Sequence, residues 1–283
     1  MKKLFSLAFL LFVSLSLVAC GGQAAGSDEQ KTVVTVGVAG AFQQQWDAVN
    51  ENLADENIVV ELVHFSDWSL LNPALADGEI DLNAFQNIFF LDNAIATNGF
   101  DITPIGYTFI SPLSIFAGGQ SNIAPDPTRT TLVGVIQDGD RIGIPGDATN
   151  AGRALKVLEA AGLIELDPAV GFLGTENDII RKNVNIEIVT AEANTLPQLL
   201  PDLAAAVINA PQALTNNLSP TQDSIFRENA LHLDITDALR NVIAARTEDK
   251  DNPVFRKIVE AYHQQNVIDV FNNEFGGAFV PAW

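Results

Sequence analysis

Runs of β-branched and apolar residues alternate along this chain with segments of helical periodicity. Residues 33–38 (VVTVGV) and 204–208 (AAAVI) have the composition of buried strands. Residues 43–56 place Trp46, Val49 and Leu53 on one helical face. Because strands that alternate with helices pair through crossover connections, this pattern predicts an α/β fold with mostly parallel sheets.

The other expected elements continue the same alternation. Strands are expected at residues 58–64, 80–84, 102–107, 113–117, 141–145, 186–190 and 241–245. Helices are expected at residues 68–77, 87–98, 150–161, 194–200, 253–265 and 267–275. A chain of 283 residues without an internal repeat has room for two such units, so two lobes are expected.

The N-terminus has the pattern of a bacterial lipoprotein signal. Two lysines precede an apolar run over residues 4–18, which is short for a membrane span and typical of a signal peptide. The run ends in LVAC, and the thiol of Cys20 is the expected site of lipid attachment. We therefore predict a signal peptide at residues 1–19 and a lipidated cysteine with a flexible tether at residues 20–32. An ordinary secretory signal with an incidental cysteine is the alternative.

Composition and motifs exclude several classes of function. A net charge of −20 would repel phosphate, so no nucleic-acid partner is expected. His64, His232 and His263 are not spaced as metal ligands, and the chain lacks the GxSxG, GxxxxGK[ST] and GxGxxG motifs. We therefore predict no catalytic residue, metal or cofactor. Cys20 is the only cysteine, so the fold must be stable without an internal disulfide.

Residues 141–154 (RIGIPGDATNAGRA) predict a carboxylate receptor. The expected strand ends at Pro145, and a helix is expected to open at Thr149 and Asn150. The free N–H groups of a first helical turn carry positive partial charge, and Arg153 lies one turn on, on the same face. A helix N-terminus beside a guanidinium can bind a carboxylate. A surface arginine beside a plain helix cap is the alternative.

Two aromatic residues occur where strands are expected to run into helices. These are Trp68, in HFSDW at residues 64–68, and Phe85, in NAFQN at residues 83–87. Ligands of open α/β sheets bind at such strand ends, so the two side chains could form the walls of an apolar slot. Ordinary core packing is the alternative for both.

Several sequence blocks in the same order resemble the methionine-binding lipoprotein family of ABC importers, the NlpA type. The blocks are VELVHFSDW (60–68), NPALADGEIDLNAFQN (72–87), IPGDATNAGRAL (144–155), LEAAGLIEL (158–166), AAVINA (205–210) and GGAFVPAW (276–283). The resemblance covers residues 33–283. It implies a two-lobed periplasmic-binding-protein fold of the two-crossover kind (type II), with the ligand in the interlobe cleft.

The resemblance also implies which residues bind the ligand. The asparagine and arginine that hold the α-carboxylate and amino end in the family match Asn150 and Arg153, and two further positions match Asn209 and Phe85. The chain departs from the family pattern at Trp68 (usually Tyr), Asn87 (His), Ser111-Pro112-Leu113 (Glu-Pro-Met) and Pro211-Gln212 (Asn-Tyr). The predicted ligand-binding residues are Trp68, Phe85, Asn87, Asn150, Arg153, Asn209 and Gln212.

These inferences combine into one predicted function. The chain is expected to be an extracytoplasmic substrate-binding lipoprotein, anchored to a bacterial cell membrane by its N-terminal lipid. It would deliver methionine or a related amino acid to an ABC permease and ATPase complex. Lobe 1 is expected at residues 33–112 plus 243–283 and lobe 2 at residues 113–242, with hinge strands at 111–117 and 241–245.

Three alternatives remain open at this point. The first is the same scaffold binding another amino acid or a short peptide, because Asn87 and Gln212 carry amides that need polar partners once a cleft closes. The second is a surface adhesin-type lipoprotein without a transport role. The third, a lipid-anchored enzyme, has no nucleophile–base or metal arrangement in its favour.

Overall fold

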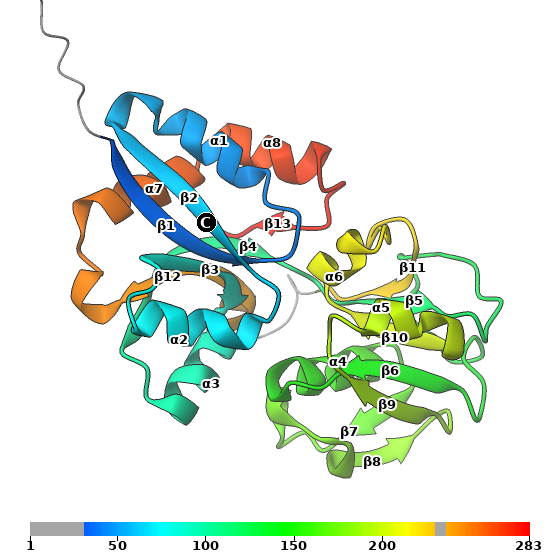
Figure 1. Ribbon diagram of the computed structural model, residues 1–283. Coiled ribbons are helices and arrows are strands. Elements are labelled where there is room, and N and C mark those ends of the chain that lie inside the picture. The colour runs from blue at the N-terminus through cyan, green and yellow to red at the C-terminus, as the bar shows by residue number, and fades with distance from the viewer. Residues whose placement is uncertain (1–30, 230–235) are drawn as a thin grey trace, which may run out of the picture. The chain divides into compact units, whose positions relative to one another are not determined.

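The computed structural model describes residues 31–229 and 236–283 (Figure 1). The predicted signal peptide at 1–19, the lipidation site Cys20 and nearly all of the predicted tether lie outside the described residues. In the part of the chain that is described, no helix combines the length and apolar character needed to cross a membrane.

The first sheet has six strands in the order β13-β4-β12-β3-β1-β2 (Figure 1). Its strands are β1 (Thr32–Ala39), β2 (Ile58–Phe65), β3 (Leu82–Asn87), β4 (Ile102–Ile110), β12 (Arg240–Arg246) and β13 (Val280–Pro281). Strand β1 pairs in parallel with β2 and β3, whereas β12 runs antiparallel to both β3 and β4. The segment that closes the described chain therefore returns to the sheet that its first strand helps to form.

Helices cover both faces of the first sheet (Figure 1). One layer holds α1 (Gln45–Asn52), α7 (Pro253–Tyr262) and α8 (Gln265–Asn273), and the other holds α2 (Leu71–Ala76) and α3 (Ile88–Asn98). Strand β12 serves both layers, because Ile243 and Ala245 pack in the α1 layer while Val242 and Ala244 pack in the α2 layer. This division follows the two-residue period of a strand.

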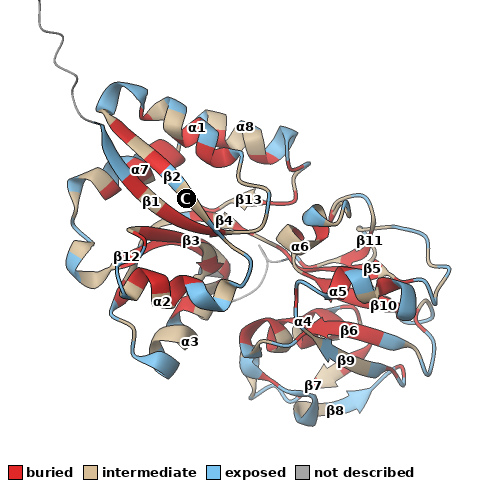
Figure 2. Ribbon diagram, in the orientation of Figure 1, coloured by how far each residue is buried: buried red, intermediate tan, exposed pale blue. Residues whose placement is uncertain are grey.

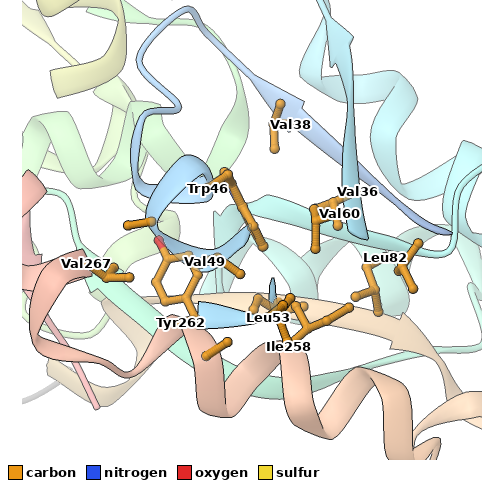
Figure 3. Packing of buried hydrophobic residues seen from close by; sticks show 14 of the residues in the cluster. Val36, Val38, Trp46, Val49, Leu53, Val60, Leu82, Ile258, Tyr262 and Val267 are labelled. Atoms are coloured by element: carbon orange, nitrogen blue, oxygen red, sulfur yellow. The ribbon is translucent and has the colours of Figure 1, made fainter. Parts of the chain in front are cut away.

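The core beneath α1 is built around an aromatic pair. Trp46 on α1 and Tyr262 on α7 meet edge to face with ring centroids 5.1 Å apart, and both are about 1% exposed. Figure 3 shows Val36, Val60 and Leu82 from three neighbouring strands beside them. The predicted helical face carrying Trp46, Val49 and Leu53 is buried in this cluster.

The second sheet has five strands in the order β11-β5-β10-β6-β9. Its strands are β5 (Ser114–Ala117), β6 (Arg141–Pro145), β9 (Glu187–Ala191), β10 (Ala205–Ile208) and β11 (Ser224–Arg227). The accompanying helices are α4 (Ala148–Ala160), α5 (Leu196–Leu199) and α6 (Ala210–Thr215). Strands β7 (Ile164–Leu166) and β8 (Ile179–Lys182) form a separate hairpin. Figure 2 shows that β10, which lies at the centre of this sheet, is buried throughout.

Short 3-10 helices complete the described chain. They are η1 (Ala54–Glu56), η2 (Trp68–Leu70), η3 (Gly171–Leu173), η4 (Glu176–Asp178), η5 (Leu200–Asp202), η7 (Thr236–Leu239) and η8 (Thr247–Asp249). The helix expected over residues 68–77 is thus divided between η2 and α2.

The prediction of mostly parallel sheets is wrong, because both sheets are mixed. In the second sheet β5 is antiparallel to β10 and β11, while β6 is parallel to β9 and β10. The chain passes between the sheets twice, from β4 to β5 and again between β11 and β12. The strands that follow these passages, β5 and β12, run antiparallel to both of their neighbours, and β13 is antiparallel to β4. Hydrophobic periodicity does not encode strand direction, so the sequence could not reveal this.

Two boundaries near the predicted site also differ from the expectation. Strand β3 extends to Asn87, so the NAFQN segment lies in the strand and not beyond it. Helix α4 begins at Ala148 with Asp147 as its N-cap, one residue before the predicted opening. The strands β7, β8, β11 and β13 were not expected, since each has at most four residues and so shows little periodicity.

Candidate ligand-binding site

One pocket is lined by residues from the elements of both sheets. From the first sheet it takes Trp68 on η2 and Phe85 and Asn87 on β3. The second contributes the remaining predicted residues: Asn150 and Arg153 on α4, Asn209 after β10, and Gln212 on α6. The structure thus brings every predicted ligand-binding residue to one pocket. Their contact with a ligand stays a prediction.

Helix α4 presents Asn150 and Arg153 because of how it starts. Gly146 and Asp147 follow β6, and an Asp147 carboxylate oxygen accepts hydrogen bonds from the Asn150 backbone N–H at 3.0 Å and the Thr149 hydroxyl at 2.9 Å. This side-chain cap fixes the first turn. Asn150 and Arg153 then lie three residues apart on one helical face and are only 8% and 3% exposed.

A chain of amide hydrogen bonds crosses the second-sheet side of the pocket. The Asn150 side-chain Nδ2 donates to both carboxylate oxygens of Asp147, each at 3.0 Å. The Asn150 Oδ1 in turn accepts from the Nδ2 of Asn209 at 2.9 Å. Two residues that the sequence singled out are therefore bonded to each other, and Asp147 stands at the beginning of the chain.

Arg153 is not a free guanidinium. Its Nε and Nη2 donate to the two carboxylate oxygens of Glu228 at 2.9 and 2.5 Å, and Nη2 also donates to the Ser111 carbonyl at 2.9 Å. Within the described residues, no hydrogen-bond partner is found for Nη1. The sequence-based expectation of a guanidinium fork open to a ligand is therefore revised: one edge of the fork is occupied by Glu228, and Nη1 is the donor left over.

Several buried amide oxygens at the pocket have no hydrogen-bond partner among the described residues. They are Asn209 Oδ1, Gln212 Oε1 and Gln45 Oε1. Gln45 also neighbours the hydroxyl of Tyr262, whose burial raises its pKa above the ordinary value for tyrosine. Unpaired buried acceptors cost free energy, so this part of the pocket suits a ligand that brings N–H donors.

The first-sheet side of the pocket is largely aromatic. Phe85 meets Phe90 edge to face with ring centroids 5.8 Å apart, and Phe109 lies 4.6 Å from Phe279. All four line the pocket. Trp68 and Phe85 are partly buried and pack against the cluster beneath α2, so they combine a core role with a place at the pocket.

The side-chain oxygen of Asn87 already has a hydrogen-bond partner within the protein. It caps α3, because its Oδ1 accepts a hydrogen bond from the Phe90 backbone N–H at 2.8 Å. Only its Nδ2 is left to meet a ligand. Gln212 differs, because its Oε1 is buried without a partner in the described chain.

Sequence reasoning missed several residues that shape the pocket. Glu228 forms an ion pair with Arg153, which is 75 residues away in the sequence, and no local sequence pattern predicts such a pair. Asp147 lies between the expected strand and the expected helix and was not assigned a role, although an acidic residue just before a helix is a recognisable cap signal. The aromatic residues Phe42, Phe90, Phe109 and Phe279 carried no local signal that separated them from core residues. Over residues 31–229 and 236–283, no cluster of three or more His, Cys, Asp or Glu side chains could hold a metal ion.

Comparison with known proteins places this arrangement in context. The model of the NlpA lipoprotein family matches residues 34–283. The chain is 35% identical over 285 residues to the D-methionine-binding lipoprotein MetQ of Escherichia coli (strain K12), an alignment that covers 99% of this chain and 98% of that protein.

Solved structures show the same similarity. A nutrient-binding protein from Burkholderia cenocepacia bound to methionine is 31% identical with a TM-score of 0.78, over 88% of this chain and 100% of that one. The substrate-binding protein of a methionine transporter from Streptococcus pneumoniae is 32% identical with a TM-score of 0.78, over 89% and 96% of the two chains.

These comparisons confirm the resemblance that the sequence blocks predicted, and with it the α/β, two-lobed substrate-binding fold. The relatives are substrate-binding proteins, so their names give no support to an enzyme. The chain belongs to the NlpA lipoprotein family.

Proposed function

We propose that this protein is the extracytoplasmic substrate-binding lipoprotein of an ABC importer and that it captures methionine or a related amino acid. The observation that carries the proposal is the pocket lined from both sheets, with amide oxygens and Arg153 on one side and aromatic rings on the other. Relatives named for methionine binding, at about a third identity over nearly the whole chain, support the same ligand class.

The pocket's chemistry fits a zwitterion with an apolar side chain. The unpaired oxygens of Asn209 and Gln212 would accept hydrogen bonds from an α-ammonium group. Glu228 balances the charge of Arg153, whose Nη1 would still donate a hydrogen bond to the α-carboxylate. Trp68 and Phe85 would flank the side chain, and a thioether packs well against aromatic rings. Asn87 Nδ2 is then the polar group that an apolar side chain would leave unpaired.

Capture would require the two lobes to close around the ligand. We propose that residues 33–112 with 243–283 and residues 113–242 move as the two lobes, because each sheet draws its strands from one of these sets apart from Thr32 of β1 and residues 240–242 of β12. The closed form would dock on the permease, with Cys20 holding the protein to the outer side of the membrane through its lipid. The lipoprotein relatives support this location.

Calorimetry and native mass spectrometry test the proposal together. The mature protein should bind methionine with 1:1 stoichiometry, and protein purified without denaturation should carry a co-purified amino-acid ligand. Trp68→Ala and Gln212→Ala should each weaken binding, whereas a substitution at the exposed Ile180 of β8 should not. A folded protein that binds no amino acid or dipeptide at millimolar concentration would contradict the proposal.

A short peptide is the second candidate ligand, and a specific feature favours it. Beyond Trp68 and Gln212 the pocket adjoins a more open hollow, which is also lined by His64, Asp67 and Glu192. This hollow has room and acidic groups for the N-terminal residue of a peptide. Parallel titration of methionine, other amino acids and dipeptides decides between them. Tighter binding of a dipeptide, weakened by Asp67→Asn or Glu192→Gln, would favour the peptide.

A further inference from the structure

We infer that Asp147 fixes the orientation of the Asn209 amide through Asn150, so that the pocket presents a carbonyl oxygen and selects ligands that carry an ammonium group. Asp147 is a positioning residue in this scheme, because it contacts the ligand-binding residues and not the ligand. The inference deepens the proposed function and rests on it for the identity of the ligand.

The hydrogen bonds from Asn209 to Asn150 and from Asn150 to Asp147 form a relay, and the Asp147 carboxylate fixes its direction. An ionised carboxylate can only accept hydrogen bonds, so Asn150 must turn its Nδ2 toward Asp147, as the distances of 3.0 Å to both oxygens show. The Asn150 Oδ1 then faces Asn209 and can only accept. Asn209 must therefore donate with its Nδ2, at 2.9 Å, which leaves its Oδ1 unpaired.

Reversal of any one amide breaks the whole chain. A flipped Asn150 would set its oxygen against the Asp147 carboxylate and its Nδ2 against the Nδ2 of Asn209. Each contact would oppose two like groups at hydrogen-bond distance, with Asn150 only 8% exposed and so little screened by water. The charge on Asp147 thus orients the amides of Asn150 and Asn209 and keeps the Asn209 Oδ1 available as an acceptor.

The Asn209 Oδ1 needs a hydrogen-bond donor from the ligand. Its Oδ1 is buried and has no hydrogen-bond partner among the described residues, and Asn209 lines the pocket. Gln212, three residues on, contributes a second unpaired buried oxygen to the same lining. An ammonium group has three N–H donors and a positive charge, so it satisfies both oxygens, whereas a hydroxyl has one donor.

Asp147→Asn separates this role from helix capping. The substituted side chain keeps an oxygen for the Asn150 N–H and Thr149 hydroxyl, and asparagine is as good an N-cap as aspartate. It also brings an Nδ2 where a carboxylate oxygen stood, and this donor can face the Asn150 oxygen. The relay can then run the other way and turn the Asn209 Nδ2 toward the pocket.

Calorimetry with matched ligands measures the selectivity. Methionine is compared with its α-hydroxy analogue, which keeps the carboxylate and thioether. For Asp147→Asn we expect methionine affinity to fall by about tenfold or more and the analogue's affinity to change by less than about threefold. Asp178→Asn is the control, since Asp178 also accepts from a nearby backbone N–H and threonine hydroxyl but both belong to Thr175, which does not line the pocket, so both affinities should be unchanged. Equal losses for both ligands, or no loss, would overturn the inference.

The orientation of the Asn209 amide can also be measured without a ligand, so this test does not depend on amino-acid binding. Neutron crystallography locates amide deuterons directly. The Asn209 Nδ2 should face Asn150 in the wild type and turn away from it in Asp147→Asn. The same Asn209 orientation in both proteins would overturn the relay. Failure of the wild type to bind methionine or any amino acid would contradict the proposed function and leave this result unaffected.

Discussion

Arg153 and Glu228 form a doubly hydrogen-bonded ion pair whose side chains are only 4% and 5% exposed. The pair lies where the chain passes between the two sheets. Arg153 donates to the carbonyl of Ser111, and Glu228 accepts from the backbone N–H of Leu113 at 2.9 Å and donates its own N–H to the Leu113 carbonyl. One buried pair thus joins α4, the pocket and both connecting segments.

The first prediction concerns the two halves of this pair. Arg153→Ala would leave the Glu228 carboxylate buried and unpaired, so we expect the free energy of unfolding to fall by about 3–5 kcal/mol. Glu228→Gln keeps the shape and an acceptor oxygen, so a smaller loss of about 1–3 kcal/mol is expected. Urea unfolding measures both. A fully stable Arg153→Ala protein would show that the pair contributes little to folding.

The same two variants show whether Arg153 contacts the ligand. Loss of affinity in Arg153→Ala has two sources, namely a missing ligand contact and a disturbed connection between the lobes. Glu228→Gln disturbs the connection while it leaves the guanidinium in place. If it retains most of the affinity that Arg153→Ala loses, the guanidinium itself contacts the ligand.

Local patterns in the sequence predicted the elements of the fold well. The strand at 141–145 matches β6, and the helical face carrying Trp46 is buried as expected. Such elements depend on periodicity within a dozen residues. Strand direction in the mixed sheets depends on pairing between distant segments, such as β12 between β3 and β4, and no local pattern encodes it.

The candidate site shows the same division. Asn150 and Arg153 were predicted from the pattern of a helix N-terminus, Asn209 was predicted from sequence blocks that resemble a family, and all three line the pocket. What surrounds them could not be found in this way. Glu228 meets Arg153 only because the chain passes twice between the sheets, so its pairing is a property of the topology. The occupied edge of the Arg153 guanidinium follows from that contact.

The second prediction concerns a close approach beside the site. A Cβ on Gly152, in α4, would lie 2.1 Å from the backbone oxygen of Phe172 in η3, so the η3 backbone would have to shift. Gly152→Ala should therefore lower stability by about 1–3 kcal/mol through overpacking, despite the higher helix propensity of alanine. Thermal unfolding measures the change.

Gly146→Ala is the matched control for this substitution. Gly146 also flanks α4, but its Cβ would meet no atom closer than 3.3 Å. The control should unfold close to the wild-type temperature. Phe172 also meets Phe89 of α3 edge to face with ring centroids 6.3 Å apart, so a shift of η3 in Gly152→Ala would disturb this contact as well. Equal stability of the two variants would contradict the expected clash.

The third prediction concerns the buried Trp46 in the core of Figure 3. Trp46→Ala should cost about 3–5 kcal/mol of stability, because the cavity left in this core cannot collapse fully. Trp46→Phe should cost much less than that. Its ring keeps most of the packing against Tyr262, and it removes a buried indole N–H that has no partner among the described residues. Urea unfolding of both variants checks the order, and equal losses would contradict it.

The fourth prediction concerns alkaline stability. Burial raises the pKa of Tyr262, so above the ordinary tyrosine pKa of about 10 the unfolded chain loses a proton that the folded chain keeps. The stabilisation from this group is complete below pH about 10 and is lost as the pH rises further. Tyr262→Phe should reduce the fall in unfolding free energy between pH 9 and 11, approximately. An equally steep fall in Tyr262→Phe and the wild type would contradict this prediction.

The fifth prediction concerns the anchor, and it depends on the LVAC sequence at residues 17–20. Cys20→Ala removes the only thiol that could take a lipid, so the variant should not incorporate a labelled fatty acid and should be lost from the membrane fraction. Ser27→Ala changes the predicted tether and should leave both properties intact. Because the described fold begins at residue 31, the released Cys20→Ala protein should still bind ligand with wild-type affinity. Fatty-acid label on Cys20→Ala would show that the lipid is attached elsewhere.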